Sequence, residues 1–276
     1  MTVTSETFRY VATLVHQRSA ILLEPGKEYL VESRLLPLAR EAGVAGVDDY
    51  VRTVRRTLRP ADLDLVVEAL TTNETSWFRD SSPFTALTAD IIPELIRARG
   101  PLLRLRIWSA ACSTGQEPYS IAMTLAEDER VRGTHIEIVA TDLSDQVLAR
   151  AKEGRYTQLE VNRGLPAPKL VRHFTRDGAS WRISAELRAK ISFHRHNLLD
   201  APPAGARFDL VYLRNVLIYF DQPTKQAILR RVKQCLTPDG FLVLGSAETT
   251  VGLDDSWERV AISRGSVYRP RQGVRS

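Results

Sequence analysis

The stretch from residue 102 to residue 142 constrains the fold more than any other part of the chain. An apolar run at 102–108 leads into seven small residues at 109–115, and Pro118 then stands where it can pre-set the first turn of a helix. A second apolar run at 136–140 ends in Thr141 and Asp142. This order of strand, small-residue turn, helix and strand ending in a carboxylate is typical of a nucleotide-binding βαβ unit, because small side chains let a ligand approach the backbone.

The turn at 109–115 does not suit every nucleotide. It contains one glycine, Gly115, so the G-x-G-x-x-G pattern of dinucleotide-binding proteins is absent. Without paired glycines to bring a pyrophosphate against the helix N-terminus, a nucleoside without phosphates fits better than NAD. Asp142 would then bind the ribose hydroxyls. An ordinary βα turn without a ligand is the alternative.

Length and composition limit the class of protein. A chain of 276 residues makes one large or two modest domains, and 43% hydrophobic residues can form a full core. No apolar run is long enough to span a bilayer, and the N-terminus lacks the apolar core of a signal peptide. The two cysteines show neither metal-ligand nor disulfide spacing, so we expect a cytoplasmic protein without a metal site. The net charge of +5 permits an acidic partner without requiring one.

Residues 1–72 read as a small all-helical domain of four helices, with breaks at 25–26, 43–46 and near Pro60. Four arginines share one face of the third predicted helix: Arg52, Arg55, Arg56 and Arg59. Such a face is either a solvated surface or a docking surface for an acidic helix. Arg34 and Arg40 on the second helix add to the docking interpretation, although glutamates on the same helix dilute it.

The rest of the chain predicts an α/β domain. A polar linker at 73–90 carries adjacent aromatic residues, Trp77 and Phe78, which we expect other parts of the protein to cover. One helix should follow, and alternating strands and helices then run through 91–276. The rhythm breaks at about 155–190, where a turn at 176–178 predicts a small inserted β-subdomain. Near the end, a turn at 238–240 should precede a strand, and a hairpin about Arg264 and Gly265 should close the sheet.

Four motifs occur in a fixed order along the chain, at 73–79, 109–119, 140–142 and 214–221. Together they resemble the bacterial chemotaxis receptor methyltransferases, the CheR family, over about residue 5 to about residue 270. The resemblance implies a helical N-terminal domain and a Rossmann-like methyltransferase domain that carries the β-subdomain. It also implies S-adenosylmethionine as methyl donor, S-adenosylhomocysteine as product, and glutamate side chains of chemoreceptors as acceptors. The partner would be the cytoplasmic helical domain of a receptor, and the methyltransferase would bind it as a monomer.

The resemblance also assigns roles to residues at the matching positions. Arg79 and Tyr219 would lie nearest the chemistry, and Arg34 and Arg40 would belong to the receptor-docking surface. Arg79 would orient a carboxylate, either that of the acceptor or that of the donor. Tyr219 would position the acceptor, or else be an aromatic residue wedged at a strand end. The donor-binding set would be Asn73, Thr75, Arg79, Glu117, Asp142, Asn197, Leu198, Asn215 and Val216.

One segment departs from the family pattern, and two rival functions remain to be weighed. The turn at 174–181 is shorter than in members that bind a receptor-tail pentapeptide, so we expect no such tether binding. A nucleic-acid methyltransferase is a rival, but the fourth strand is followed by 214–219 rather than by an Asn/Asp-Pro-Pro-aromatic turn, and no basic groove with interleaved aromatics is evident. The second rival is a module that binds S-adenosylmethionine and receptor without transferring methyl.

Overall fold

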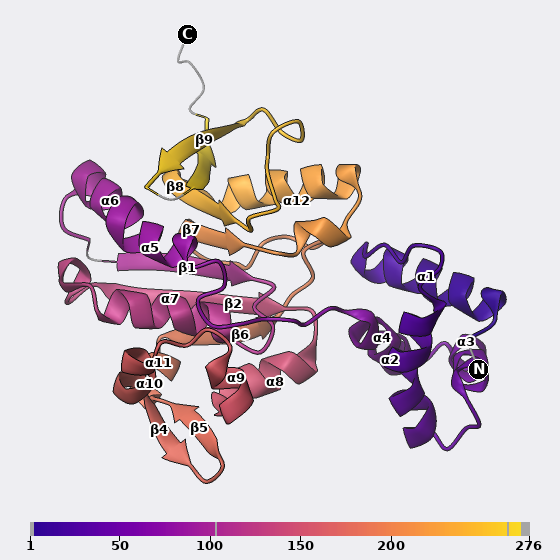
Figure 1. Ribbon diagram of the computed structural model, residues 1–276. Helices are drawn as coiled ribbons and strands as arrows, with labels where there is room; N and C mark the ends of the chain where they lie inside the picture. The colour runs from indigo at the N-terminus through magenta and orange to yellow at the C-terminus, as the bar shows by residue number, and fades with distance from the viewer. Residues whose placement is uncertain (1–2, 103, 264, 272–276) are drawn as a thin grey trace. The chain divides into compact units, whose positions relative to one another are not determined.

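The chain forms two compact units in a computed structural model that describes residues 3–102, 104–263 and 265–271. The first unit comprises Met1–Thr72 with Tyr219–Thr224, and the second comprises Asn73–Ile218 with Lys225–Ser276. Figure 1 traces both units by residue number. No helix among the described residues is long and apolar enough to cross a membrane.

The first unit contains four helices, as the sequence predicts: α1 (Ser5–Ser19), α2 (Glu28–Glu41), α3 (Val47–Thr57) and α4 (Pro60–Leu70). Their apolar faces meet in a core that includes Val11, Val15, Val31, Leu35 and Val66. Thr4 caps α1 by accepting from the Thr7 amide, and the Asp48 carboxylate of α3 accepts from both threonine hydroxyls.

The arginine face of α3 is largely engaged with neighbouring acids. Arg52 pairs with Asp49 at 2.6 Å and Arg55 pairs with Glu6 at 2.7 Å. Arg59, just beyond the helix, pairs with an aspartate at 2.7 Å. These exposed pairs fit the solvated-surface interpretation better than the docking one, because the charge available to an acidic partner is partly balanced.

The second unit is built on a seven-stranded sheet whose order is β6-β2-β1-β7-β8-β10-β9. Strands β6, β2, β1, β7 and β8 run parallel, whereas β10 is antiparallel to both of its neighbours. The strands are β1 (Arg104–Ala110), β2 (His135–Asp142), β6 (Ile191–Arg195), β7 (Phe208–Leu213), β8 (Leu236–Leu244), β9 (Trp257–Ile262) and β10 (Gly265–Pro270). The predicted closing hairpin is therefore present, although Arg264 in its turn lies outside the described residues.

Helices connect and cover this sheet (Figure 1). They are α5 (Ser82–Ala86), η1 (Leu87–Ile91), α6 (Ile92–Arg99), α7 (Gln116–Ala126), η2 (Glu129–Val131), α8 (Asp145–Glu153), η3 (Leu217–Tyr219) and α12 (Gln222–Cys235). The single helix expected before the first strand is wrong in one respect, because η1 has π-helical hydrogen bonding. Pro93 follows directly and lacks the backbone N–H that a continuous α-helix would use. This accounts for the local change in the hydrogen-bonding pattern of the helix.

The predicted β-insertion is a three-stranded antiparallel sheet with the order β3-β5-β4. It contains β3 (Arg155–Thr157), β4 (Phe174–Asp177), β5 (Ser180–Ile183) and the short helices α9 (Gln158–Asn162), α10 (Ala167–His173) and α11 (Ala185–Arg188). Trp77 of the linker is buried edge-on against Tyr156 at 4.8 Å and Phe174 at 5.4 Å between ring centroids. The expectation that the linker aromatic residues are covered is thus confirmed for Trp77.

Strand β8 begins earlier than the sequence predicts. The turn expected at 238–240 lies within it, because Leu236 already pairs with Phe208 before the register shifts and Phe241 pairs with Leu210. Gly240 makes this irregularity possible, since an added Cβ would lie 2.9 Å from the Asp209 carbonyl oxygen. A β-bulge of this kind keeps the strand paired through a segment that looks like a loop in the sequence.

Candidate active site

The strand order reverses between β1 and β7, and some of the predicted site residues, among them Asp142 and Asn215, follow or end the strands on either side. β2 and β6 extend the sheet in one direction from β1, whereas β7 and β8 extend it in the other. Ligands of open α/β sheets bind in the crevice at such a switch point. The turn after β1, the end of β2 and the end of β7 therefore form the candidate site.

The turn after β1 has an unusual backbone. Ala111, Ser113 and Gly115 all adopt positive φ, at 63°, 50° and 93°. Gly115 also has no room for a side chain, since an added Cβ would lie 3.0 Å from the Ala151 Cβ and 3.1 Å from the Tyr156 hydroxyl. This combination explains why a glycine opens α7 although the turn lacks the dinucleotide pattern.

Asp142, at the end of β2, is fixed against this turn. Its carboxylate accepts from the Ser113 amide at 2.8 Å and from the Ser144 amide at 3.1 Å. Ser113 also donates its hydroxyl to the Asn73 carbonyl oxygen at 2.7 Å, so it links the linker to the end of β2. The structure thus brings together Asp142 and Asn73, two of the residues predicted to bind the donor.

Glu117, in the first turn of α7, is a largely buried carboxylate with two partners. It accepts from the Ser109 hydroxyl at 2.8 Å and pairs with the Arg214 guanidinium at 3.0 Å. Burial raises the pKa of the Glu117 carboxyl above its ordinary value, whereas the charge of Arg214 and the two hydrogen bonds oppose the rise. Glu117 therefore combines a buried carboxyl with a cationic partner, the Arg214 guanidinium.

Arg214, at the end of β7, is a central residue that the sequence did not assign to the site. Its side chain is only 1% exposed, and besides Glu117 it donates to the Asp80 carboxylate at 2.8 Å and to the Arg79 carbonyl oxygen at 2.7 Å. The guanidinium also lies 5.7 Å from the centre of the Phe84 ring. The single guanidinium of Arg214 therefore links α7, the end of β7 and the linker.

Glu248 is the second residue that the sequence missed, and it fixes the loop after β7. Its two carboxylate oxygens accept from four backbone amides, those of Asn215, Val216, Leu217 and Gly245, at 2.7 to 2.9 Å. Asn215 takes up a positive φ of 58° in this loop. An acid that follows β8 gives no sequence signal for this role, because three of its four partners are backbone amides 31 to 33 residues away.

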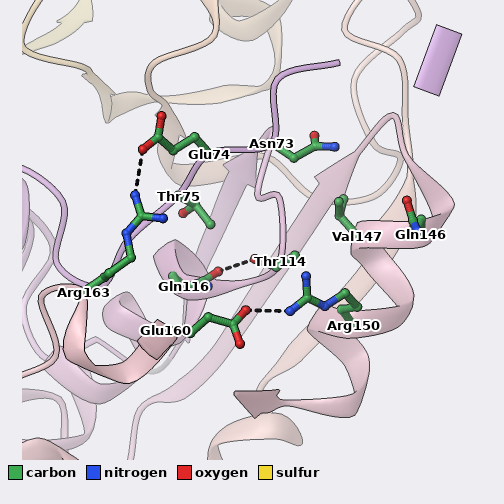
Figure 2. A pocket seen from close by; sticks show the side chains of 10 residues that line it. All are labelled: Asn73, Glu74, Thr75, Thr114, Gln116, Gln146, Val147, Arg150, Glu160 and Arg163. Atoms are coloured by element: carbon green, nitrogen blue, oxygen red, sulfur yellow. Dashed lines mark hydrogen bonds and ion pairs between the residues drawn. The ribbon is translucent and has the colours of Figure 1, made fainter. Parts of the chain in front are cut away.

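A pocket of about 320 Å³ opens beside the turn (Figure 2). Two ion pairs cross its lining, between Arg163 and Glu74 at 2.7 Å and between Arg150 and Glu160 at 2.6 Å. Of the predicted donor-binding residues it includes two, Asn73 and Thr75. The lining comprises Asn73, Glu74, Thr75, Thr114, Gln116, Gln146, Val147, Arg150, Glu160 and Arg163.

The remaining predicted residues fall in three places. Asn197 and Leu198 follow β6, and the preceding His196 donates its amide to the Asp142 carbonyl oxygen at 2.8 Å, so this segment adjoins the end of β2. The Arg79 guanidinium donates to the Glu74 carbonyl oxygen at 3.2 Å. Tyr219 belongs to the first unit, as do Arg34 and Arg40. The Arg34 guanidinium bonds to the carbonyl oxygens of Ala69 and Thr71 at the end of α4, which gives it a structural role.

Among the described residues, no cluster of three or more histidine, cysteine, aspartate or glutamate side chains could hold a metal ion. Cys112 is fully buried in the turn, and burial raises the pKa of its thiol, which keeps it protonated.

Comparisons with known proteins agree on one family. Residues 73–265 match the family described as CheR methyltransferase, SAM binding domain, and residues 6–71 match CheR methyltransferase, all-alpha domain. Chemotaxis protein methyltransferase 1 of Pseudomonas aeruginosa is 40% identical over 98% of this chain and all of its own length. Chemotaxis protein methyltransferase Cher2 of Pseudomonas putida is 41% identical over 96% of this chain and 98% of its own. A relative in Vibrio parahaemolyticus is 37% identical over 98% of both chains.

Proposed function

Because the chain belongs to the CheR methyltransferase family, we propose that it transfers a methyl group from S-adenosylmethionine to glutamate side chains of chemoreceptors, forming methyl esters. The coarser conclusion is firm: the chain is a methyltransferase with an S-adenosylmethionine-binding domain. What we propose beyond this is that the partner is a chemoreceptor and that the methyl acceptor is a glutamate carboxylate. The partner segment would be the cytoplasmic helical domain of a receptor, bound by a monomer in the cytoplasm.

The side chains at the switch point suit this donor. Its ribose carries two hydroxyls and its methionine end carries an ammonium group, and both pair well with carboxylates. Asp142 would bind the ribose and Glu117 would face the methionine end. Asn73 and Thr75 would contribute from the linker, while Asn197, Leu198, Asn215 and Val216 would flank the adenosyl part. The acid pair Asp142 and Glu117, fixed about one small-residue turn, is the observation that carries the proposal.

The main contribution of the protein to the reaction is to position the acceptor against the donor. S-adenosylmethionine supplies an electrophilic methyl group on a sulfonium sulfur. A glutamate acceptor is already ionised at neutral pH, since its ordinary pKa is about 4.3, so no general base is required. This chain's residues would contribute by holding the acceptor oxygen at near-attack distance, about 3 to 3.5 Å, and by excluding water.

Arg79 and Tyr219 are the residues that we propose to act on the acceptor. A guanidinium orients a carboxylate through two parallel hydrogen bonds, which an ammonium does less well. Among the described residues, the Arg79 guanidinium bonds to one backbone oxygen, at 3.2 Å, and this long bond can be exchanged for a bond to a carboxylate. Tyr219 would position the acceptor through its hydroxyl.

Transfer of labelled methyl tests the proposal directly. The protein is incubated with S-adenosylmethionine labelled in the methyl group and a receptor cytoplasmic fragment. We expect label on glutamate that is released by mild base, as an ester requires. Label on added nucleic acid instead would favour a nucleic-acid methyltransferase. Binding of the donor without any transfer would favour a module that binds S-adenosylmethionine and lacks activity.

A further inference from the structure

The linker is held by the inserted β-subdomain at several points. We call residues 155–188, from β3 to α11, the β-insertion. The Arg163 carbonyl oxygen accepts from the Trp77 amide at 3.0 Å, and the Arg163 guanidinium pairs with Glu74 at 2.7 Å, as Figure 2 shows. The Trp77 side chain is buried against Tyr156 of the same insertion. A backbone hydrogen bond, an ion pair and a ring contact therefore join the linker to the β-insertion.

Gly164 sets how closely these two segments approach each other. Its φ of 98° is one that other residues rarely adopt, and an added Cβ would overlap the Trp77 carbonyl oxygen. The Trp77 carbonyl carbon would lie only 3.3 Å from the same Cβ. Any side chain at position 164 would therefore separate the linker from the β-insertion.

Tyr156 extends the contact from the linker to the turn after β1. Its buried hydroxyl donates to the Thr114 carbonyl oxygen at 2.8 Å, while its ring packs edge-on against Trp77. The turn is also tied to the linker directly, since the Ser113 hydroxyl donates to the Asn73 carbonyl oxygen at 2.7 Å. The β-insertion, the linker and the turn are thus connected, and the pocket of Figure 2 is lined by residues of all three.

A displacement of the linker at Trp77 would reach the residues that we propose to contact the donor. After Trp77 the linker is fixed to α7, because the Phe78 amide donates to the Ser120 hydroxyl oxygen at 3.1 Å. Thr75 and Asn73 lie before Trp77, two and four residues away. A shift of the Trp77 backbone should therefore be passed toward Thr75 and Asn73.

We propose that Gly164, Tyr156 and Trp77 are positioning residues for the methyl donor. They would act through the linker, by holding Asn73 and Thr75 beside the turn in the geometry that binds S-adenosylmethionine. This inference rests on the proposed function, since the donor contacts of Asn73 and Thr75 are part of it. A site that is already in its binding geometry loses less conformational entropy when the ligand binds, and this raises affinity.

Gly164→Ala tests the proposal with two matched controls. Gly133 and Gly178 also have positive φ, at 83° and 60°, but an added Cβ would meet no atom within 4 Å at either position. Gly178 is a control within the β-insertion itself. Affinity for S-adenosylhomocysteine would be measured by calorimetry on the full-length wild type and the three variants, and urea unfolding would give the stability of each.

We expect Gly164→Ala to weaken S-adenosylhomocysteine binding about ten-fold, the equivalent of one lost hydrogen bond, and the two control variants to bind within about two-fold of the wild type. All three variants should be less stable than the wild type, because alanine is strained at a positive φ. A loss of affinity confined to Gly164→Ala would therefore report on positioning and not on stability alone.

A second set of variants decides the matter if Gly164→Ala does not fold. The Trp77 Nε1 has no hydrogen-bond partner within the described ranges, so phenylalanine retains the ring contact without losing a polar one. Trp77→Phe should therefore bind S-adenosylhomocysteine at least about three-fold more tightly than Trp77→Ala. Tyr156→Phe keeps the ring but loses the bond to the Thr114 carbonyl oxygen, and it should weaken binding about three-fold or more.

Two results would overturn the inference. The first is an affinity of Gly164→Ala within about two-fold of both control variants, because the close approach at Gly164 would then have no effect on the donor. The second is wild-type affinity in both Trp77→Ala and Tyr156→Phe. Since these affinities are measured without an acceptor, a wild type that binds S-adenosylhomocysteine but methylates no receptor fragment would overturn the proposed acceptor and not this inference.

Discussion

Arg214 balances two acids with one buried guanidinium, and its replacement by methionine should destabilise the second unit in a pH-dependent way. The substitution keeps an apolar stem but removes the ion pairs to Glu117 at 3.0 Å and to Asp80 at 2.8 Å, and the bond to the Arg79 carbonyl oxygen at 2.7 Å. Removing one partner of a buried pair costs about 3 to 5 kcal/mol. Because the Asp80 side chain is 31% exposed and the Glu117 side chain 13%, we expect the lower end, about 3 kcal/mol.

The pH dependence follows from Glu117. Burial raises the pKa of this carboxyl and Arg214 is the first of the groups that oppose the rise, so Arg214→Met should raise the pKa further. Glu248 and Tyr212 also face Glu117, but neither supplies a positive charge. A carboxyl whose pKa is higher in the folded than in the unfolded state stabilises the fold below the unfolded value, and that contribution is lost as pH rises through the folded value. The loss of stability in the variant should therefore be smaller near pH 5, just above the ordinary pKa of a glutamate, than near pH 8.

Urea unfolding followed by tryptophan fluorescence measures this difference, with Arg230→Met as the control for loss of an exposed arginine. The double variant Glu117→Gln/Arg214→Met should be more stable than Arg214→Met alone near pH 8, because it no longer buries an unpaired charge. A loss of stability below about 1 kcal/mol near pH 8, or a loss that is equal at both pH values, would refute the assignment of Arg214 as the counter-ion of Glu117.

Three further variants probe the turn, the donor site and the chemistry. Gly115→Ala should lower the free energy of unfolding by about 2 kcal/mol, because the residue has a φ of 93° and its new Cβ would lie 3.0 Å from Ala151; urea unfolding at wild-type stability would contradict this. Asp142→Asn should weaken S-adenosylhomocysteine binding by about ten-fold in calorimetry while the amide oxygen still accepts from Ser113, and unchanged affinity would remove Asp142 from the donor site. Arg79→Ala should lower methyl transfer by about ten-fold or more without unfolding the protein, since its guanidinium makes one 3.2 Å bond within the described part of the chain, and unchanged turnover would exclude it from the chemistry.

The β1-α7-β2 unit could be predicted from the sequence because its signals are local. Apolar runs mark both strands, small residues mark the turn, and Asp142 directly follows the second run. Each signal acts over a few residues, so periodicity and turn chemistry suffice to find it. The all-helical first unit was predictable for the same reason, since its four helices are separated by glycine and proline.

The Arg214 network could not be predicted, because its members meet only in the folded chain. Glu117 lies 97 residues before Arg214 and Asp80 lies 134 residues before it. In the sequence, Arg214 is one basic residue after an apolar strand, and such residues are usually exposed. Its burial depends on two acids supplied by other elements, and no local pattern records that. The π-helical turn before Pro93 and the bulge in β8 escaped prediction for a related reason: both are compromises between local propensity and tertiary packing.

Glu248 limits which groups of the loop after β7 are available to bind the methyl donor. The amides of Asn215, Val216 and Leu217 all donate to its carboxylate, so these backbone groups are already engaged in holding the loop. If Asn215 and Val216 flank the adenosyl part, as we propose, they must do so through side chains or carbonyl oxygens. Gly245, directly after β8, requires the same arrangement, since an added Cβ would lie 2.7 Å from the Glu248 carboxylate and 3.0 Å from the Asn215 amide. The motif at 214–221 therefore combines a buried counter-ion with a loop whose shape is set by an acid that follows the next strand of the sheet.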